Sequence, residues 1–361
     1  MALLKRDAFL HRYGPTIDWL LETDPEQPAV RYFTLRDLLD LPDDDGGVRA
    51  SKEQIGRSGP VVAILQAQHS EGYWVQPGAG YSPKYTGTVW QLMFLAQFGA
   101  DGSDDRVRRA CEYVLSHTRA SNGIFSATGS PSGFIHCLSG NLLSALLDLG
   151  SGGTHGRAGS GASDYARDDR VREMIELQAR FVTGAGIATA HEKIAPRYYR
   201  SGTTGPHCAC ANNNRFHCAW GAIKTLTTFG KIPAEERSEQ VHRAIEQSVS
   251  LLLSHDPALA RYPSVYGETP SSNWFKFGYP LGYTSDVLHN VEALTRVGMI
   301  SDPRLAGAIR SIESKRTDKG RWIQEYQLKS PTWFQQEPLG KPSKWVTLRA
   351  LRVLKAADGS V

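Results

Sequence analysis

Phe216-His-Cys-Ala-Trp-Gly-Ala-Ile-Lys-Thr-Leu-Thr-Thr-Phe-Gly230 places a His-Cys step before an apolar run with helical spacing, and it ends in glycine. Two other stretches, residues 134–150 and 283–298, have a small polar or His/Cys step followed by the same kind of run and ending. Glycine directly after an apolar run is typical of a helix C-terminus. A fold that repeats this helix and directs each N-terminal end at a common centre would bring the polar steps together.

Helical periodicity dominates the rest of the chain, because apolar residues recur three or four positions apart while strand-like alternation is nearly absent. The segments with this spacing are Val61–Gln68, Thr88–Phe98, Arg106–Ser116, Asn141–Leu149, Val171–Phe181, Ala222–Phe229, Glu239–Leu253, Val287–Val297, Arg304–Ser314 and Ser343–Ala356. We therefore expect an all-α protein.

A longer repeat joins these helices in pairs. Asp105 starts a helix that runs towards Asn122-Gly-Ile-Phe125, and Asp302 starts one that runs towards Lys319-Gly-Arg-Trp322. Both have an acidic N-cap and both end at a Gly-x-aromatic turn about twenty residues later. Each such helix is followed by a loop and by one of the apolar helices, so the repeated unit is a pair of helices.

Helix pairs of this kind cannot bury their apolar faces singly and must stack on one another. We predict an α/α toroid, a closed barrel of about five to six inner and outer helix pairs, over residues 59–361. Residues 1–58 lack the Gly-aromatic turn and are predicted to form an N-terminal helical extension. Residues 151–162 are rich in Gly and Ser and predict a flexible loop between two units.

The composition restricts the class of protein. A chain of 361 residues with 40% hydrophobic and 22% charged residues is typical of a globular protein. Its net charge of +4 is spread without a basic block, which argues against nucleic acid as a partner. No run of 18 apolar residues and no signal peptide is present, so we expect no integral membrane segment and a cytoplasmic location. Its five cysteines are too few and too clustered for a disulfide framework.

Two motifs carry a family resemblance. Gln66-Ala-Gln-His-Ser-Glu-Gly-Tyr-Trp74 resembles the Gln and Trp repeat signature of squalene cyclases, and Asp286-Val-Leu-His289 resembles the Asp-x-x-His helix of protein prenyltransferase β subunits. With its helix-pair rhythm over roughly Val61 to Leu354, the chain resembles the terpenoid cyclase and protein prenyltransferase α/α-toroid superfamily. Further segments are similar to a bacterial branch of squalene-cyclase-like proteins: Tyr81–Leu92, Cys137–Leu143, and Arg321-Trp322 followed by Ser343–Leu351.

The resemblance implies a central cavity for an apolar, isoprenoid-like small molecule and, as in the prenyltransferases, a zinc ion held by an Asp, a Cys and a His. Cys218 and His289 occupy the places of that Cys and that His. The Asp belongs two residues before the Cys, where this chain has Phe216. A third ligand would have to come from Cys137, Asp286, His136 or His217. The Asp-x-Asp-Asp proton donor of squalene-hopene type cyclases is also absent.

The predicted centre has its own chemistry. Inner helices would point their N-terminal ends at it, and a thiol near such an end ionises more easily and becomes a nucleophile or a soft metal ligand. Cys218, His289, Asp286 and Cys137 are therefore the candidate catalytic residues. Plain packing of the cysteines, and an N-cap Asp286 beside a satisfied core His289, explain the same pattern equally well. His207-Cys-Ala-Cys210 is open to a metal, a redox or a surface-loop interpretation.

Aromatic rings and imidazoles near the helix starts are the candidate substrate-binding residues, since aromatic faces bind apolar chains and stabilise developing positive charge. They are Tyr85, Trp90, His136, His217, Trp220, Tyr283 and Trp345. The same rings are also typical of packing between repeats.

Three hypotheses about function follow. The first is an enzyme of the prenyltransferase or terpene cyclase-like class, with zinc bound or with the thiols acting directly. The second is a non-catalytic helical scaffold that binds a lipid or a protein. The third is a proton-initiated cyclase or hydro-lyase with Asp286 as its acid.

Overall fold

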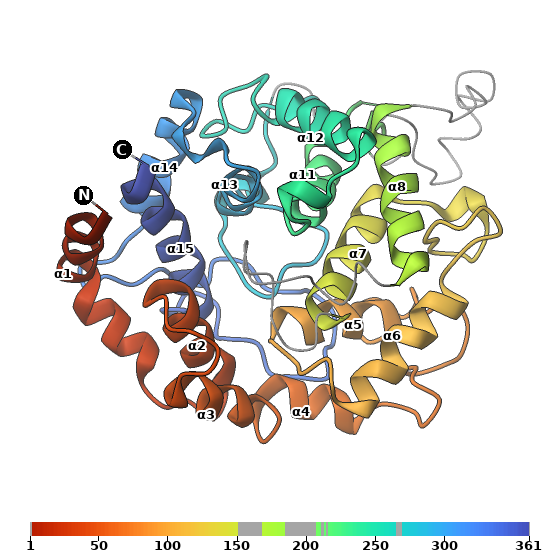
Figure 1. Cartoon of the computed structure of the whole chain (residues 1–361), viewed down its shortest axis with the longest axis horizontal. Helices are drawn as coiled ribbons and strands as arrows, with labels where there is room; N and C mark the ends of the chain where they lie inside the picture. The colour runs from red at the N-terminus through yellow and green to blue at the C-terminus, as the bar shows by residue number, and fades with distance from the viewer. Residues whose placement is uncertain are drawn as a thin grey trace.

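The computed structural model of the chain describes residues 2–150, 168–184, 207–210, 213, 216–264 and 269–360. Every regular element within these residues is a helix, which confirms the all-α prediction. The helices form a ring of two layers, an α/α toroid (Figure 1). The predicted loop at residues 151–162 lies outside the described residues.

The inner layer consists of helices that follow one another around the hub. They are α2 (Pro28–Phe33) with a π-helical continuation η1 (Thr34–Leu38), α5 (Thr88–Gln97), α7 (His136–Gly150), α11 (Ala219–Phe229), α13 (Val287–Arg296) and α15 (Lys344–Ser360). Consecutive inner helices from α5 to α15 pack on each other, and α15 packs on α2 and η1. Helices in this position have neighbours on most sides, so nearly every residue of α5 is buried.

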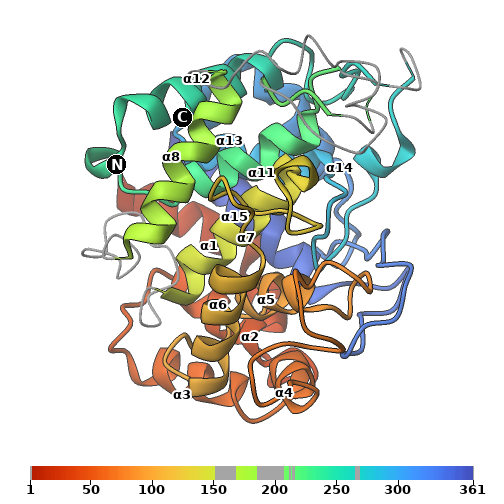
Figure 2. The same ribbon diagram turned by 90° about the vertical axis from the view of Figure 1, so that its right-hand side faces the viewer.

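The outer layer covers the inner one (Figures 1 and 2). It contains α1 (Ala2–Leu21), α3 (Gly46–Ile55), α4 (Gly59–Gln66), α6 (Asp105–His117), α8 (Asp169–Thr183), α12 (Glu239–Leu252) and α14 (Ala306–Ser314). Short 3-10 turns lie at Pro131–Gly133, Ala234–Glu236, Ser272–Phe275, Met299–Ser301 and Pro303–Leu305. The outer helices are amphipathic: α12 buries Val241, Ala244, Ile245, Ser248 and Leu252, which share one face.

The Gly-aromatic turns have the same geometry in distant units. Trp74 Nε1 donates to the carbonyl of Ile64 at 2.8 Å, and Trp322 Nε1 donates to that of Ile312 at 2.7 Å. In each unit the tryptophan backbone N–H also donates to a threonine hydroxyl of the next inner helix, Thr88 in one case and Thr347 in the other. The turn therefore fastens an outer helix to the inner helix that follows it.

The N-terminal ends of the outer helices carry a second repeated contact. Asp104, Asp168 and Asp302 each cap the backbone N–H two positions later, and each pairs with the arginine at that position. The cap of α6 is thus Asp104, one residue before the Asp105 that begins the helix.

The first helices of the chain close the ring. α1 and η1 pack against α15, and Phe33 of α2 lies 6.0 Å from Trp345 between ring centroids. Arg352 of α15 also forms an ion pair with Asp37 of η1. Residues 28–38 therefore contribute to the wall of the hub, while the boundary at residue 58 stays a prediction.

A loop before α13 crosses the hub. Within this hub loop, residues 277–286, the backbone of Leu281 exchanges two hydrogen bonds with the Gln97 side chain, at 2.7 and 2.9 Å. Asn141 donates to the carbonyl of Gly282 at 3.3 Å. Tyr279 stacks on Trp345 at 4.3 Å between centroids. The loop therefore spans the hub from Gln97 at the end of α5 to Asn141 and Trp345 near the starts of α7 and α15.

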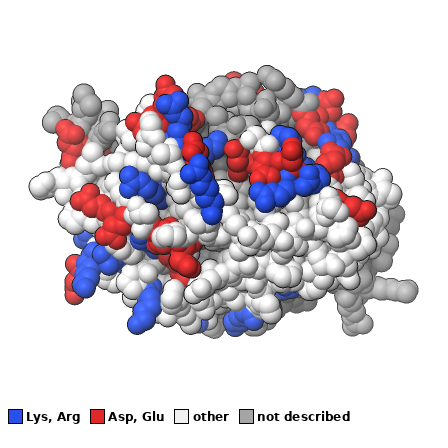
Figure 3. Space-filling view, turned by 90° about the horizontal axis from the view of Figure 1, so that it is seen from below, with Lys and Arg blue, Asp and Glu red and all other residues white. Residues whose placement is uncertain are grey.

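Charged residues are mixed over the surface. On the described part of the face in Figure 3, lysines and arginines lie among aspartates and glutamates, and no broad basic patch forms. None of the helices that the structure describes has both the length and the apolar character needed to cross a bilayer.

Candidate functional site

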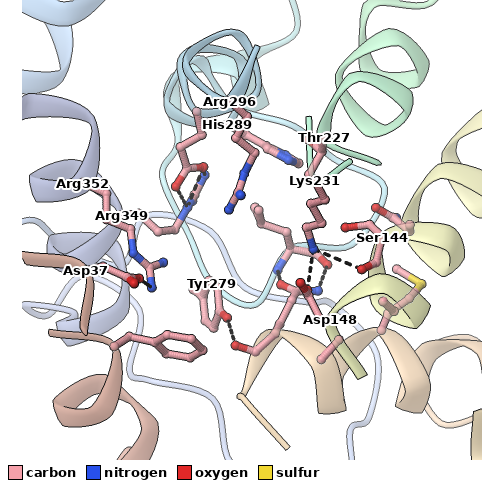
Figure 4. A pocket seen from close by; sticks show the side chains of 18 of the residues that line it. Asp37, Ser144, Asp148, Thr227, Lys231, Tyr279, His289, Arg296, Arg349 and Arg352 are labelled. Atoms are coloured by element: carbon pink, nitrogen blue, oxygen red, sulfur yellow. Dashed lines mark hydrogen bonds and ion pairs between the residues drawn. The ribbon is translucent and has the colours of Figure 1, made fainter. Parts of the chain in front are cut away.

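A cavity of about 160 Å³ lies at the hub, among the middle and C-terminal parts of the inner helices (Figure 4). Its lining residues come from every inner helix and from the hub loop. They are Phe33, Arg36, Asp37, Met93, Ala96, Gln97, Asn141, Ser144, Ala145, Asp148, Thr227, Lys231, Tyr279, Leu281, His289, Glu292, Arg296, Arg349 and Arg352. This hub cavity is where segments far apart in the chain meet.

The lining is charged, with an excess of cations. Arg36, Lys231, Arg296, Arg349 and Arg352 provide five positive charges against three carboxylates, those of Asp37, Asp148 and Glu292. The Arg296 side chain extends from the end of α13 towards the middle of the cavity (Figure 4). Within the described residues it has no carboxylate in ion-pair contact. The C-terminal ends of the inner helices carry partial negative charge and reduce the positive potential of the cavity. The side-chain charges still leave the cavity net positive, which favours an anionic ligand.

Arg349 organises one wall. Its guanidinium, 2% exposed, donates to Glu292 at 2.7 Å, to Asp286 at 3.2 Å and to the carbonyl of Gly278 at 2.8 Å. Burial would lower the pKa of Arg349, but the Asp286 and Glu292 carboxylates outweigh burial and raise it. A buried cation with two carboxylates holds α13, α15 and the hub loop in one arrangement.

Three further ion pairs involve two more carboxylates of the lining. Asp37 accepts from both Arg36 and Arg352. Burial raises the pKa of Asp37, but these two guanidiniums more than reverse that effect and leave it lowered. Lys231, just beyond α11, donates to the carbonyl of Ser144 at 3.1 Å and pairs with Asp148. Each of these three cations thus has a carboxylate partner, in contrast to Arg296.

Lys224 and His289 form a buried pair behind the cavity wall. Lys224 Nζ lies 3.1 Å from His289 Nδ1 and 2.7 Å from the Ser285 hydroxyl, and no carboxylate touches it in the described chain. Burial lowers the pKa of Lys224 to about 8. Burial, and then the charges of Lys224 and Arg349, lower the pKa of His289 well below its usual 6.5. The imidazole is thus neutral, with Nδ1 accepting from the lysine and the proton on Nε2.

The predicted catalytic residues lie close together, but only His289 lines the hub cavity. Asp286 caps α13 by accepting from the His289 backbone N–H at 2.6 Å, and Arg349 occupies its carboxylate. Cys137, in the first turn of α7, and Cys218, the N-cap of α11, contact each other on the far side of Lys224. Lys224 therefore stands where the sequence led us to expect a metal or a substrate.

These positions do not fit zinc. Lys224 occupies His289 Nδ1 and Arg349 occupies Asp286, so neither is directed at the thiols. Among the residues that the structure describes, no three His, Cys, Asp or Glu side chains are arranged to hold a metal ion. The zinc prediction gains no support from this donor set.

The predicted substrate-binding aromatics pack against other aromatic rings. Trp90 lies 4.9 Å from Tyr85 and 5.0 Å from Tyr283 between ring centroids, and Trp345 is 2% exposed beneath Tyr279. The four candidates Tyr85, Trp90, Tyr283 and Trp345 do not line the hub cavity. They fill the N-terminal side of the hub, where the sequence analysis placed the substrate.

The remaining candidates lie further out. His136 is buried and shares a hydrogen bond with Gln178 at 2.8 Å. Trp220 packs near Trp274 at 6.0 Å between centroids. His217 lines a separate, outer cavity of about 530 Å³. None of the three reaches the hub cavity.

Sequence reasoning missed the charged residues of the cavity. Their signal was present, since Lys224 interrupts the apolar run of α11 and Arg349 and Arg352 stand one helical turn apart in α15. Charges within helices that have no solvent-exposed face must point at one another or at a cavity.

Comparison with known proteins identifies no family for the chain. No protein-family model matches the chain, and no curated protein matches it. One similar solved structure is a type II terpene cyclase from Scytonema in its apo form, with a TM-score of 0.49 and 14% identity over 99% of each chain. A likeness at this level says nothing about the substrate or the reaction of the present chain.

Proposed function

We propose that the protein is an enzyme of the terpenoid cyclase-like class whose hub cavity binds a small molecule with an anionic group and an apolar part. The observation that carries this proposal is the Arg296 guanidinium, which extends into a net-positive cavity with no carboxylate partner in the described chain. Arg296 is an exposed residue, so an anion there would displace water from the guanidinium and gain a charge-assisted hydrogen bond.

The apolar part of the ligand has its own surface. Phe33, Met93, Ala96, Ala145 and Leu281 contribute apolar atoms to the lining. The volume of about 160 Å³ is below the roughly 300–1,000 Å³ of typical ligand sites, so the ligand is small. Of the isoprenoid-like substrates that the sequence suggested, a short one with a charged head matches this cavity, and a long uncharged chain does not.

The proposed chemistry is proton transfer through His289. If Nε2 gives its proton to the bound molecule, Nδ1 takes one from Lys224, whose pKa of about 8 makes the exchange accessible near neutral pH. His289 is then the catalytic residue and Lys224 a positioning residue that acts through it. Asp286, held by Arg349, caps α13 at the His289 backbone N–H and so fixes the backbone from which the imidazole extends.

The ligand class is tested with a matched pair of probes. Isopentenyl phosphate and isopentenol share an apolar part and differ in the anionic group. Calorimetric titration of the full chain is expected to show at least tenfold tighter binding of the phosphate, and Arg296→Met is expected to abolish that preference. Arg243→Met, an exposed arginine of α12, is the control and should leave binding unchanged.

Other outcomes decide against the proposal. Equal binding of the two probes, or a phosphate preference that survives in Arg296→Met, would contradict the anion site. Absence of binding by either probe would favour the scaffold hypothesis. The hypothesis that Asp286 is the acid gains nothing from the geometry, because its carboxylate already accepts from Arg349 and from the α13 backbone.

A further inference from the structure

Four of the five cysteines gather at the starts of α7 and α11, away from the hub cavity. The Cys218 thiol is within hydrogen-bonding reach of the thiols of both Cys137 and Cys210. Cys208, next to them, bonds to Thr225 instead. None of the four forms a disulfide in this structure.

Backbone pairing explains why the thiols meet. Ala209 and His217 form an antiparallel bridge, and Cys218 N–H donates to the Cys208 carbonyl at 2.9 Å. Because side chains alternate along extended backbone, Cys210 and Cys218 share one face of this pair. Cys208 has a left-handed backbone, with φ of 58°, and lies beside them through its bond to the Cys218 N–H.

Close helix packing brings the remaining thiol to that face. A side chain added at Gly140 of α7 would come within 2.8 Å of the Lys224 backbone, so α7 and α11 touch through their backbones. Cys137 follows His136 at the beginning of α7 and is thereby held against Cys218.

The thiols differ in exposure. Cys210 and Cys218 are partly exposed, whereas Cys137 and Cys208 are buried. The hydrogen bond with Cys137 raises the pKa of Cys218 to about 12. Two thiols of the group, Cys210 and the central Cys218, are thus within reach of a small oxidant from solvent.

We propose that Cys218 is the central thiol of an oxidation site, where a peroxide produces an intramolecular disulfide between Cys218 and either Cys210 or Cys137. One thiol of the pair attacks the peroxide, becomes a sulfenic acid and releases one water molecule. The second thiol displaces hydroxide from that sulfur, and the hydroxide leaves as a second water molecule with the thiol proton. Two thiols and one hydrogen peroxide thus give one disulfide and two waters. No residue of the site lines the hub cavity, so this inference does not depend on the proposed function.

The test counts thiols in the full chain. After brief treatment with hydrogen peroxide, the protein is unfolded in the presence of N-ethylmaleimide and its mass is measured. The five cysteines are expected to give three labels. Trypsin cuts after Arg215 and Lys224, so the peptide 216–224 should appear joined to the peptide 201–215 or to the peptide 120–157.

Variants separate the site from general oxidation. Cys218→Ser is expected to keep all four of its labels, and the double variant Cys137→Ser/Cys210→Ser all three. Cys208→Ser, which leaves the central group intact, should still lose two. Thermal unfolding checks that each variant is folded. Five labels in the oxidised wild type, a joined peptide without residues 216–224, or label loss that persists in Cys218→Ser would each overturn the proposal.

Discussion

At the scale of single residues, the hub contains charged side chains that are buried away from water. Lys224 is 1% exposed and, among the described residues, bonds to a histidine nitrogen, a hydroxyl and a backbone carbonyl but to no carboxylate. An ammonium group without a carboxylate partner is costly to bury, which is why its pKa falls. Such a residue is retained for its chemistry or its position, since a methionine would fill the same space without the desolvation cost.

The pH dependence of stability tests this interpretation. The folded-state pKa of Lys224 is about 8, below the usual 10.5, so the unfolded chain binds more protons between these values. The contribution of Lys224 to the free energy of unfolding therefore increases as the pH rises from 8 towards 10. Lys224→Met should lack that increase and be more stable than the wild type at pH 8. Urea unfolding at pH 8.0 and 9.5 measures both, and an identical pH slope in the two proteins would contradict the buried ammonium.

Removing the Arg349 cation is expected to lower the stability of the protein, whereas removing the Lys224 cation is expected to raise it at pH 8. Arg349→Met leaves Asp286 and Glu292 without their buried partner, and breaking such a pair typically costs about 3–5 kcal/mol of the free energy of unfolding. Arg243→Met removes an exposed i,i+4 pair with Glu239 and should cost about 0.5 kcal/mol or less. Chemical denaturation of the two variants makes the comparison. Equal losses would mean that the Arg349 network is no stronger than a surface pair.

At the scale of elements, the helices and their pairing were predictable and the arrangement of the hub was not. Periodicity located α5 and α12 within about one residue at each end, because packing in two layers makes the apolar spacing regular. The hub loop has no periodicity, so nothing in the sequence revealed that Tyr279 and Leu281 cross the hub and line its cavity. His289 was predicted as a site residue at the starts of the inner helices, and it lines a cavity that lies among their middle and C-terminal parts.

The Gly-aromatic turns provide an element-scale prediction. Thr88→Val and Thr347→Val each remove the hydroxyl that accepts from a tryptophan backbone N–H and leave that group buried and unpaired. Each should lower the free energy of unfolding by about 1–3 kcal/mol. The control is Thr295→Val, whose hydroxyl bonds only to a carbonyl of its own helix and is half-buried. If Thr295→Val lowers the free energy of unfolding as much as Thr88→Val and Thr347→Val do, the turns do not hold the repeats together.

At the scale of the whole molecule, the ring closes through contacts between the two ends of the described chain. α1 buries Phe9, Tyr13, Ile17 and Leu20, and it packs on α15. Glu313 of α14 also accepts hydrogen bonds from Arg12 and Tyr13 of α1. Closure of this kind couples the first helices to the last ones, so we expect them to unfold together.

Calorimetry distinguishes a coupled ring from an appended segment. The full chain is expected to unfold in one transition, and removal of residues 1–21 should lower the temperature of that transition. If residues 1–58 were an independent extension, a separate low-temperature transition would appear in the full chain. Its loss on truncation, with the main transition unchanged, would then support the domain boundary that the sequence suggested.

Because α1 packs against α15, the ring does not require the chain to begin at α1 and end at α15. The N- and C-terminal helices lie side by side in Figure 1, and Asp358 is close enough to interact with Arg12. A short peptide linker can therefore join Ser360 to Ala2, and new ends can be cut at the exposed turn Gly56–Arg57 between α3 and α4. Such a circular permutant keeps every inner helix in its place, so it separates the chemistry of the hub from the connectivity that builds it.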